Sequence, residues 1–355
     1  MVSAPLRLAI NGYGRIGRSV LRALYESGPG ERLRVVAINE PADLATMAHL
    51  TRYDSTHGRF PGKVDEGSEQ LIINGDGIAT SHHRDPAECG WSRHSVDLVL
   101  ECSGSFNSRS RAQLLLDNGA GAVLFSQPAQ ADVDATIVYG VNHHALRREH
   151  RIISAASCTT NAAVPVIEVL NKAFGIEHGL ITTVHSAMND QPVIDAYHHT
   201  DLRKTRSAMH SIIPVETALA RGVERVLPQL QGRFAAQAMR VPTMNVSAID
   251  LSLQVARSVD VGLVNQVLSE ASEQALRGIL GYTNEPLASC DFNHDSRSAI
   301  VDASQTRVAG DRLVKVLIWF DNEWGYAHRM LDVAGHYLDL RCNRAVTPAL
   351  AGGRV

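Results

Sequence analysis

The chain has 355 residues, of which 45% are hydrophobic and 20% are charged, and its formal net charge is −3 at pH 7. That length favours two domains, each large enough to bury a core of its own. The small net charge gives no electrostatic reason to expect nucleic acid or an anionic membrane as the main partner. No apolar run approaches the ~18 residues of a membrane span, and the N-terminus has no signal-peptide pattern, so we expect a cytoplasmic protein.

The cysteines and histidines show no spacing that is typical of a disulfide framework or a metal site. The five cysteines are odd in number and none has CxxC spacing, which predicts reduced thiols. Histidines stand in adjacent pairs at 82–83, 143–144 and 198–199. Because adjacent residues point in different directions on a helix or strand, we interpret these pairs as surface side chains, with metal binding as the alternative.

The first half of the chain alternates short apolar runs with a helical pattern. We expect buried parallel strands at "LRLAING", "RVVAINE", "VDLVLECSG", "AVLFSQP" and "ATIVYGVN", which are branched and bounded by Gly, Asn or Pro. Between the first two, "RSVLRALYES" has helical spacing and is followed by a Gly-Pro-Gly stop. This βαβ opening predicts a Rossmann domain over residues 1–157.

After residue 174 the pattern changes to longer, partly alternating runs, such as "GLITTVHSAM", "AAQAMRVPT", "AIDLSLQVAR" and "LVKVLIWFDN". They predict a mostly antiparallel sheet with helices on one face, which is an α+β catalytic domain over residues 158–322. Helical periodicity returns in "YAHRMLDVAGHYLDL", so we expect a helix at about 323–340 that joins the first domain, and a tail at 341–355. The predicted fold class is therefore α/β, with a Rossmann domain plus an α+β domain.

A glycine-rich turn follows the first predicted strand. "AINGYGRIG" places Gly12, Gly14 and Gly17 in GxGxxG spacing between a strand and a helix, where a pyrophosphate can approach the backbone and the helix N-terminus. Glu40 ends the second strand, where its carboxylate can accept hydrogen bonds from ribose hydroxyls and would repel a 2′-phosphate. This pattern favours NAD over NADP. The alternative is a tight turn with an incidental glutamate.

A single cysteine precedes the long helical run that starts the second domain. Ser157 is a candidate N-cap, so Cys158 would lie in the first turn, where a helix N-terminus favours a lowered thiol pKa. Pro165 predicts a kink or break in this helix. His185, at the end of a predicted strand, can supply the partner imidazole. The alternative for Cys158 is a buried structural residue.

The order and spacing of several motifs resemble the glyceraldehyde-3-phosphate dehydrogenase family over nearly the entire chain. They are "NGYGRIGR", "SAASCTTN", "TTVHSAMNDQ", "DLRKTR", "SIIP", "MRVPT" and "WFDNEWGYAHRM". Within this family, "MAHLTRYDSTHGRF", "HSAMNDQPVIDAYH" and "DFNHDSRSAIVDASQTRV" are most similar to the branch of erythrose-4-phosphate dehydrogenases.

The resemblance implies a role for each matching residue. Cys158 would be the nucleophile and His185 its base. The positions implied to contact NAD are Gly12, Gly14, Arg15, Ile16, Gly17, Glu40, Arg84, Ser126, Asn322 and Tyr326. The positions implied to bind the substrate phosphate are Asp190, Lys204 and Arg240, and those of a second anion site are Ser157, Thr159, Thr217 and Ala218.

The chain departs from the usual family pattern at both anion sites. Met188 replaces a threonine and Lys204 replaces an arginine at the first, which exchanges a bidentate fork for a point charge. At the second, Ala218 replaces a glycine and Glu216 stands beside it, where a carboxylate disfavours attack by inorganic phosphate. The hypothesis is that water, rather than inorganic phosphate, attacks the thioester that Cys158 would form with the oxidised substrate. Ala162 stands where the family often has a second cysteine, which excludes a disulfide across that turn.

The resemblance implies an NAD-dependent aldehyde dehydrogenase that oxidises D-erythrose 4-phosphate to 4-phosphoerythronate, in the branch that feeds pyridoxal phosphate synthesis. The alternatives are a phosphorylating glyceraldehyde-3-phosphate dehydrogenase and a non-catalytic NAD-binding scaffold. Family members are usually homotetramers, and residues 186–211 resemble the loop that reaches a neighbouring subunit's cofactor. We expect no nucleic-acid, membrane or metal partner.

Overall fold

The computed structural model describes residues 5–27, 32–198 and 201–342. It divides the chain into two compact units, Met1–Ser157 together with Ala327–Val355, and Cys158–Tyr326. Three features named above lie outside the described residues, namely the Gly-Pro-Gly stop, His199 and the tail from residue 343 onward.

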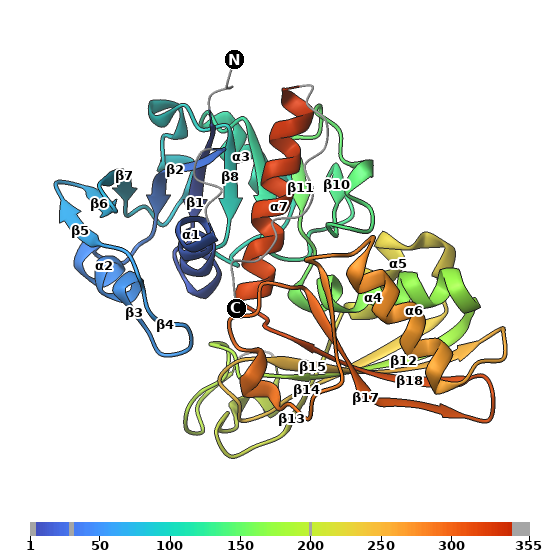
Figure 1. Ribbon diagram of the computed structural model, residues 1–355. Helices are drawn as coiled ribbons and strands as arrows, with labels where there is room; N and C mark the ends of the chain where they lie inside the picture. The colour runs from blue at the N-terminus through green and yellow to red at the C-terminus, as the bar shows by residue number, and fades with distance from the viewer. Residues whose placement is uncertain (1–4, 28–31, 199–200, 343–355) are drawn as a thin grey trace. The chain divides into compact units, whose positions relative to one another are not determined.

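Within the described residues, the first unit holds a nine-stranded sheet in the order β10-β11-β9-β8-β1-β2-β7-β6-β5 (Figure 1). Neighbours from β10 to β7 are parallel, whereas β6 and β5 extend the β7 edge with antiparallel pairing. The strands are β1 (Leu6–Asn11), β2 (Leu33–Asn39), β5 (Val64–Gly67), β6 (Gln70–Ile73), β7 (Asp76–Ser81), β8 (Leu98–Glu101), β9 (Ala122–Phe125), β10 (Ala135–Thr136) and β11 (Ile152–Ser154), and a separate hairpin joins β3 (Tyr53–Asp54) to β4 (Gly58–Arg59). The predicted Rossmann fold is confirmed.

Two parts of this sheet differ from the expectation. The run "ATIVYGVN" forms only the two-residue β10, because Ile137 and Val138 are buried by packing outside the ladder. The sheet instead continues through β11, which was not predicted. Strands β5 to β7 were also not predicted, because their outward faces carry polar side chains and no continuous apolar run marks them.

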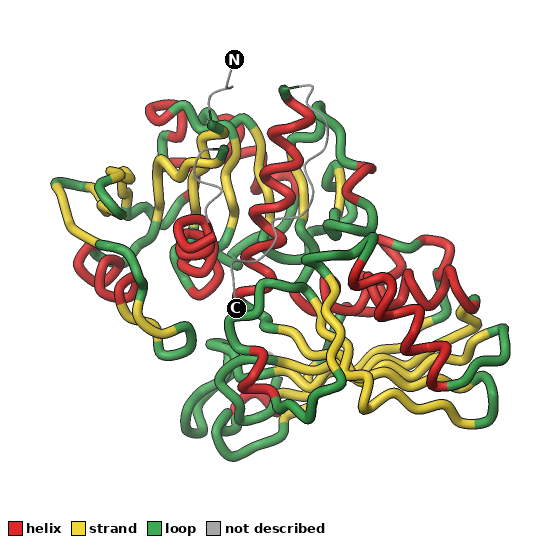
Figure 2. The backbone as a smooth tube through the Cα atoms, viewed as in Figure 1, coloured by secondary structure: helices red, strands yellow, loops and turns green. Residues whose placement is uncertain are grey.

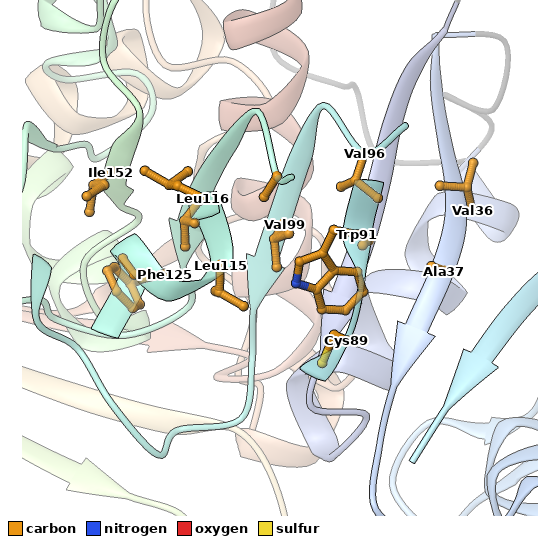
Figure 3. Close-up of a cluster of buried hydrophobic side chains, with 14 of the residues drawn as sticks. Val36, Ala37, Cys89, Trp91, Val96, Val99, Leu115, Leu116, Phe125 and Ile152 are labelled. Carbon is orange, nitrogen blue, oxygen red and sulfur yellow. The ribbon is translucent and has the colours of Figure 1, made fainter. Parts of the chain in front are cut away.

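The helices of the first unit are α1 (Arg15–Ser27), α2 (Leu44–Arg52) and α3 (Arg109–Asp117). Helix α1 is the predicted helix, and its apolar stripe from Val20 to Leu24 is buried. On α3, Leu115 packs into a core with Phe125 of β9 and Val99 of β8 (Figure 3). Trp91 is fully buried in the same core beside Cys89. Cys89 therefore acts as a small hydrophobic residue.

Helix α7 (Trp324–Arg341) begins in the second unit and continues in the first. Its part in the first unit contacts the remainder of that unit through polar side chains. The Ser27 hydroxyl lies 3.3 Å from Nε2 of His328, Arg32 forms an ion pair with Asp339, and the Tyr139 ring stands edge-on to that of His336. This helix is buried along almost its entire length.

Within the described part of the second unit, a seven-stranded sheet has the order β13-β14-β12-β15-β18-β17-β16. Most neighbours are antiparallel, but β12 pairs with β14 and β16 pairs with β17 in parallel. The strands are β12 (Ile176–His185), β13 (Ile213–Val215), β14 (Phe234–Arg240), β15 (Ser247–Val255), β16 (Leu280–Thr283), β17 (Ala299–Ala309) and β18 (Leu313–Phe320). The four alternating runs named above form β12, β14, β15 and β18, as predicted.

Helices α4 (Cys158–Phe174), α5 (Leu219–Val226) and α6 (Val261–Glu273) lie on one face of this sheet (Figure 2). Helix α4 is apolar on nearly all sides, and its residues from Thr160 to Ile167 are buried. The break expected at Pro165 does not occur, since α4 is helical from Cys158 to Phe174 with that proline inside it. The uninterrupted helix keeps Cys158 at its first residue.

We expect Gly335→Ala to stabilise the chain by about 0.5–1 kcal/mol, because a glycine inside a helix loses more backbone entropy than alanine on folding. A Cβ at Gly335 would meet no described atom within 4 Å. Urea unfolding would measure the gain. Gly121→Ala is the matched contrast, since its Cβ would lie 2.5 Å from the Asp97 carbonyl oxygen. If Gly335→Ala also destabilises the chain, the helix is packed differently.

Candidate functional site

Five polar residues meet at one edge of the second unit's sheet, which we call the polar edge: His185, Ser186, Arg240, Ser247 and Asn322. Strand β12 ends at His185 and the parallel β14 ends at Arg240, and the two residues are direct partners. The antiparallel β15 begins at Ser247, opposite Phe320 at the end of β18. Strand direction and register therefore bring these residues together, although they are far apart in the sequence.

Cys158 and His185 face each other, as the sequence predicted. The Cys158 Sγ lies 3.8 Å from Nε2 of His185 and 3.8 Å from the Thr159 hydroxyl. The other ring nitrogen, Nδ1, is 2.9 Å from the Ser186 carbonyl oxygen, which can only accept, so we assign the proton to Nδ1 and take Arg240 Nη1, a donor 3.2 Å from the same nitrogen, as a contact and not a hydrogen bond. Nε2 is then an unprotonated acceptor directed at the thiol.

Burial sets the charge state of this pair. Burial, followed by the nearby Arg240 cation, lowers the pKa of His185 to about 4. Burial also raises the pKa of Cys158 and outweighs the hydrogen bonds from Thr159. The lowered thiol pKa expected from the helix N-terminus is thus wrong for this structure, because desolvation of the thiolate costs more than the helix end supplies. At neutral pH the pair is a thiol and a neutral imidazole.

Arg240 couples to both members of the pair. Its Nη1 lies 3.2 Å from His185 Nδ1 and 3.4 Å from the Ser186 carbonyl oxygen. A cation at this position disfavours the imidazolium and favours the thiolate, so it lowers both pKa values.

We therefore expect Arg240→Gln to raise the pKa of His185 toward its ordinary value and the pKa of Cys158 further above its own. The pH dependence of Cys158 alkylation measures the second shift, and imidazole NMR measures the first. Lys172→Gln removes one charge from an exposed position on α4 and should shift neither. Unchanged titrations in Arg240→Gln would refute the coupling.

The charged residues predicted to bind the substrate phosphate form a cluster near this pair. Lys204 Nζ is 2.8 Å from the Asp190 carboxylate. Burial would raise the pKa of Asp190, but Lys204 and Arg240 outweigh it and hold that pKa below its ordinary value. Two cations and one carboxylate leave a net positive charge, which suits a phosphate. Met188 is 45% exposed and offers no hydrogen-bond donor at its side chain.

The predicted second anion site includes the start of α5. Thr217 accepts a hydrogen bond from the Leu219 amide at 3.2 Å, and Ala218 is the exposed residue before the helix. Helix α5 packs closely on α4, because a Cβ at Gly222 would lie 2.8 Å from the Thr160 hydroxyl. Ser157 and Thr159, on either side of the thiol, are half-buried.

In the first unit, the glycines of the turn after β1 have distinct surroundings. Gly12 has φ +89°, and a Cβ there would lie 2.4 Å from the Ser103 backbone. A Cβ at Gly17 would lie 2.2 Å from the Gly12 carbonyl oxygen, whereas one at Gly14 would meet no described atom within 4 Å. Gly12 and Gly17 thus close the turn, and Gly14 leaves open space at the N-terminus of α1. This cradle fits a dinucleotide pyrophosphate.

Of the other predicted cofactor residues, those in the first unit follow strands of its sheet or lie on α1, whereas Asn322 and Tyr326 belong to the second unit. Glu40 accepts a hydrogen bond from the Tyr13 amide at 2.7 Å, so it supports the turn. Arg15 forms an ion pair with Asp54, and Ile16 beside it is half-buried. Arg84 is exposed after β7, and Ser126 is half-buried after β9. In the other unit, Tyr326 is buried in the first turn of α7.

Sequence reasoning missed a network of buried, hydrogen-bonded polar side chains beneath the glycine turn. Glu101 is fully buried at the end of β8 and accepts from Asn11 at 2.5 Å, and Asn39 donates to Asn11 at 2.9 Å. The Ser103 amide also donates to Glu101 at 2.9 Å. This network connects the ends of β1, β2 and β8 under the turn. The signal was a polar residue at the end of each apolar run.

A strained residue just before the nucleophile was also missed. Ala156 has φ +58°, in the left-handed region that alanine rarely adopts, and its amide donates to the Ser154 hydroxyl at 3.1 Å. No glycine marked this position in the sequence. Ala156 lies in the connection between β11 and α4, two residues before Cys158.

The described residues offer neither a membrane-spanning helix nor a cluster of metal ligands. No described helix combines the length and the apolar character that a bilayer span requires. No group of three or more His, Cys, Asp or Glu side chains among the described residues could hold a metal ion.

Comparison with protein families gives two matches along the chain. Residues 6–109 match the NAD binding domain of glyceraldehyde 3-phosphate dehydrogenase, and residues 157–322 match its C-terminal domain. The first match covers the glycine cradle and Glu40, and the second begins at the thiol and ends at Asn322. Since both matches agree with the geometry of the thiol, the imidazole and the dinucleotide cradle, the chain belongs to the glyceraldehyde 3-phosphate dehydrogenase family and is an NAD-dependent oxidoreductase.

Proposed function

We propose that this enzyme oxidises D-erythrose 4-phosphate to 4-phosphoerythronate, through a hemithioacetal and a thioester on Cys158 that water resolves. The observation that carries the chemistry is the 3.8 Å contact between Cys158 Sγ and His185 Nε2 at the polar edge. The choice of sugar is supported by the similarity to the erythrose-4-phosphate dehydrogenase branch. That branch also places the product in the synthesis of pyridoxal 5′-phosphate.

The first chemical step follows from the protonation states. His185 Nε2 takes the thiol proton as Sγ adds to the aldehyde carbon, which gives a hemithioacetal. The Cys158 amide, at the first residue of α4, has no partner within the helix and is placed to stabilise the oxyanion. His185 then returns the thiol proton to the oxyanion, which gives the hydroxyl of the hemithioacetal. When that hydroxyl proton passes back to His185, the hydrogen on the same carbon leaves with the C–H electron pair as hydride, and a thioester forms. NAD supplies the hydride acceptor.

The substrate phosphate is held by the cluster of Asp190, Lys204 and Arg240 in this proposal. Lys204 gives a point charge without a fixed fork, and Met188 adds no donor, so the site constrains the phosphate position less than an arginine–threonine pair would. A less constrained phosphate suits a sugar that is one carbon longer than glyceraldehyde 3-phosphate.

Water, rather than inorganic phosphate, is proposed to attack the thioester. At the second anion site Glu216 is exposed, and the Ala218 methyl group stands where the family usually has a glycine. A carboxylate beside Thr217 opposes binding of a second phosphate. Hydrolysis of the thioester gives the free acid and returns the thiol.

Comparison of kcat/KM for D-erythrose 4-phosphate and D-glyceraldehyde 3-phosphate, each with and without inorganic phosphate, tests this proposal. We expect the four-carbon sugar to be preferred and the rate to be independent of phosphate, with no acyl phosphate formed. Preference for the three-carbon sugar with strict phosphate dependence would instead identify the phosphorylating dehydrogenase. Absence of turnover with either sugar would favour the non-catalytic scaffold.

We further propose a cytoplasmic homotetramer. The segment 186–211 carries several strongly exposed apolar side chains, which suits contact with another subunit: Val193, Ile194, Tyr197 and Leu202. All five cysteines are described and free, which suits a reducing compartment. Sedimentation velocity measures the assembly, and a monomer at micromolar concentration would contradict it.

A further inference from the structure

A second set of contacts at the polar edge surrounds the side chain of Asn322. Ser186 follows β12, Ser247 begins β15 and Asn322 follows β18, and these strands are adjacent in the sheet. The Ser186 hydroxyl lies 3.0 Å and the Ser247 hydroxyl 2.9 Å from Asn322 Oδ1. The exposed fractions are 0% for Ser186, 1% for Ser247 and 8% for Asn322.

The direction of these hydrogen bonds can be assigned from the backbone. The Ser186 amide donates to the Ser247 hydroxyl oxygen at 3.1 Å, so the Ser247 proton is left to donate elsewhere. An amide oxygen has two lone pairs, and the two serine hydroxyls occupy both. Among the described residues, no hydrogen bond is recorded for the amide nitrogen of Asn322. That nitrogen is therefore the group left to meet a ligand.

We propose that Ser186 and Ser247 are positioning residues that fix the Asn322 amide with its N–H groups toward the cofactor. In this orientation Asn322 donates a hydrogen bond to the carbonyl oxygen of the nicotinamide carboxamide. An asparagine without these two hydroxyls can rotate its amide by half a turn and present oxygen instead of nitrogen. The inference rests on the NAD contact that the family resemblance implies for Asn322, and it is independent of the sugar.

The prediction concerns cofactor affinity and can be measured without turnover. NAD carries both a carbonyl and an NH₂ group at C3 of its pyridine ring, the 3-acetylpyridine analogue keeps only the carbonyl, and ADP-ribose lacks the ring. If Asn322 donates, the unaltered protein binds NAD and the acetylpyridine analogue with similar affinity, within about threefold. If Asn322 accepts, the analogue loses a hydrogen bond, which is about a fivefold to tenfold loss.

Isothermal titration of the three ligands against Ser186→Ala, Ser247→Ala and the double variant tests the proposal. We expect the double variant to bind NAD about fivefold to tenfold more weakly and to bind ADP-ribose unchanged, with each single variant showing a smaller loss. The double variant should also favour NAD over the acetylpyridine analogue, because its amide is free to turn. Ser252→Ala, a half-buried serine on the same strand β15, is the matched control and should change none of these affinities.

Two results would overturn the proposal. One is an unaltered protein that already binds the acetylpyridine analogue tenfold more weakly than NAD. The other is a set of serine variants that leave the NAD-to-analogue ratio unchanged or lose ADP-ribose binding in parallel, which is the result of a merely structural role. Asn322→Ala tests separately the assumption that Asn322 contacts NAD. Unchanged NAD affinity in that variant would refute the contact itself, whatever the serine variants do.

Discussion

Cys158→Ser is expected to lower kcat by on the order of 10⁴-fold or more while leaving cofactor affinity and the unfolding temperature near those of the unaltered protein. A serine hydroxyl is a far weaker nucleophile than the thiol that faces His185 Nε2 at 3.8 Å. Serine is also close to cysteine in size, so the start of α4 should remain intact. Steady-state NADH formation and NAD titration on the same preparation measure both properties.

Cys102→Ser is the matched control for that substitution. Cys102 also follows a strand, and burial raises its thiol pKa to about 12, so it is not available as a nucleophile. Turnover within a few-fold of the unaltered rate is expected. An active Cys158→Ser enzyme would place the nucleophile elsewhere and remove the basis of the thioester mechanism.

Gly17→Ala is expected to destabilise the first unit by about 1–3 kcal/mol and to weaken NAD binding by at least about tenfold. Helix propensity alone favours alanine over glycine by about 1 kcal/mol within a helix. Here a steric clash makes the net effect on stability unfavourable, because the new Cβ would lie 2.2 Å from the Gly12 carbonyl oxygen. That oxygen belongs to the backbone, so it cannot move aside as a flexible side chain could. Thermal unfolding and NAD titration measure the two effects.

Gly14→Ala separates binding from folding at the same turn. Its Cβ would meet no described atom within 4 Å, so the unfolding temperature should stay close to that of the unaltered protein. Cofactor affinity should fall, because the methyl group would occupy the space through which the pyrophosphate approaches the turn. Equal stability losses in the Gly14 and Gly17 variants would show that the turn is built differently.

The parts of the fold that sequence patterns predicted are those where burial gives a periodic signal. Strands β8 and β9 are fully buried, and β1 and β2 are buried except at one arginine each, so all four have nearly continuous apolar runs. Strand β18 alternates as a half-buried strand should. The short β11 and the polar hairpins of β5 to β7 lack such a signal. At residues 135–142 the apolar run reflects packing outside the ladder, so burial alone misled the prediction.

The meeting of Cys158 with His185 was predictable from the sequence, but the electrostatics and supporting contacts of the site were not. Cys158 and His185 were expected to meet, and strand register brings Arg240 to the same edge. The sequence could not indicate that desolvation would exceed the effect of the helix end on the thiol pKa. Ser186, Ser247 and Glu101 are ordinary polar residues in sequence, and only the adjacency of strand ends gives them partners.

The central claim is that an acyl group is carried on Cys158 before water releases it. Rapid chemical quenching of the enzyme with D-erythrose 4-phosphate and NAD, followed by peptide mass spectrometry, tests this claim most directly. We predict an acyl adduct on the peptide that contains Cys158, together with a burst of about one NADH per active site. NADH formation with an unmodified Cys158 peptide, or with the adduct on another residue, would contradict it.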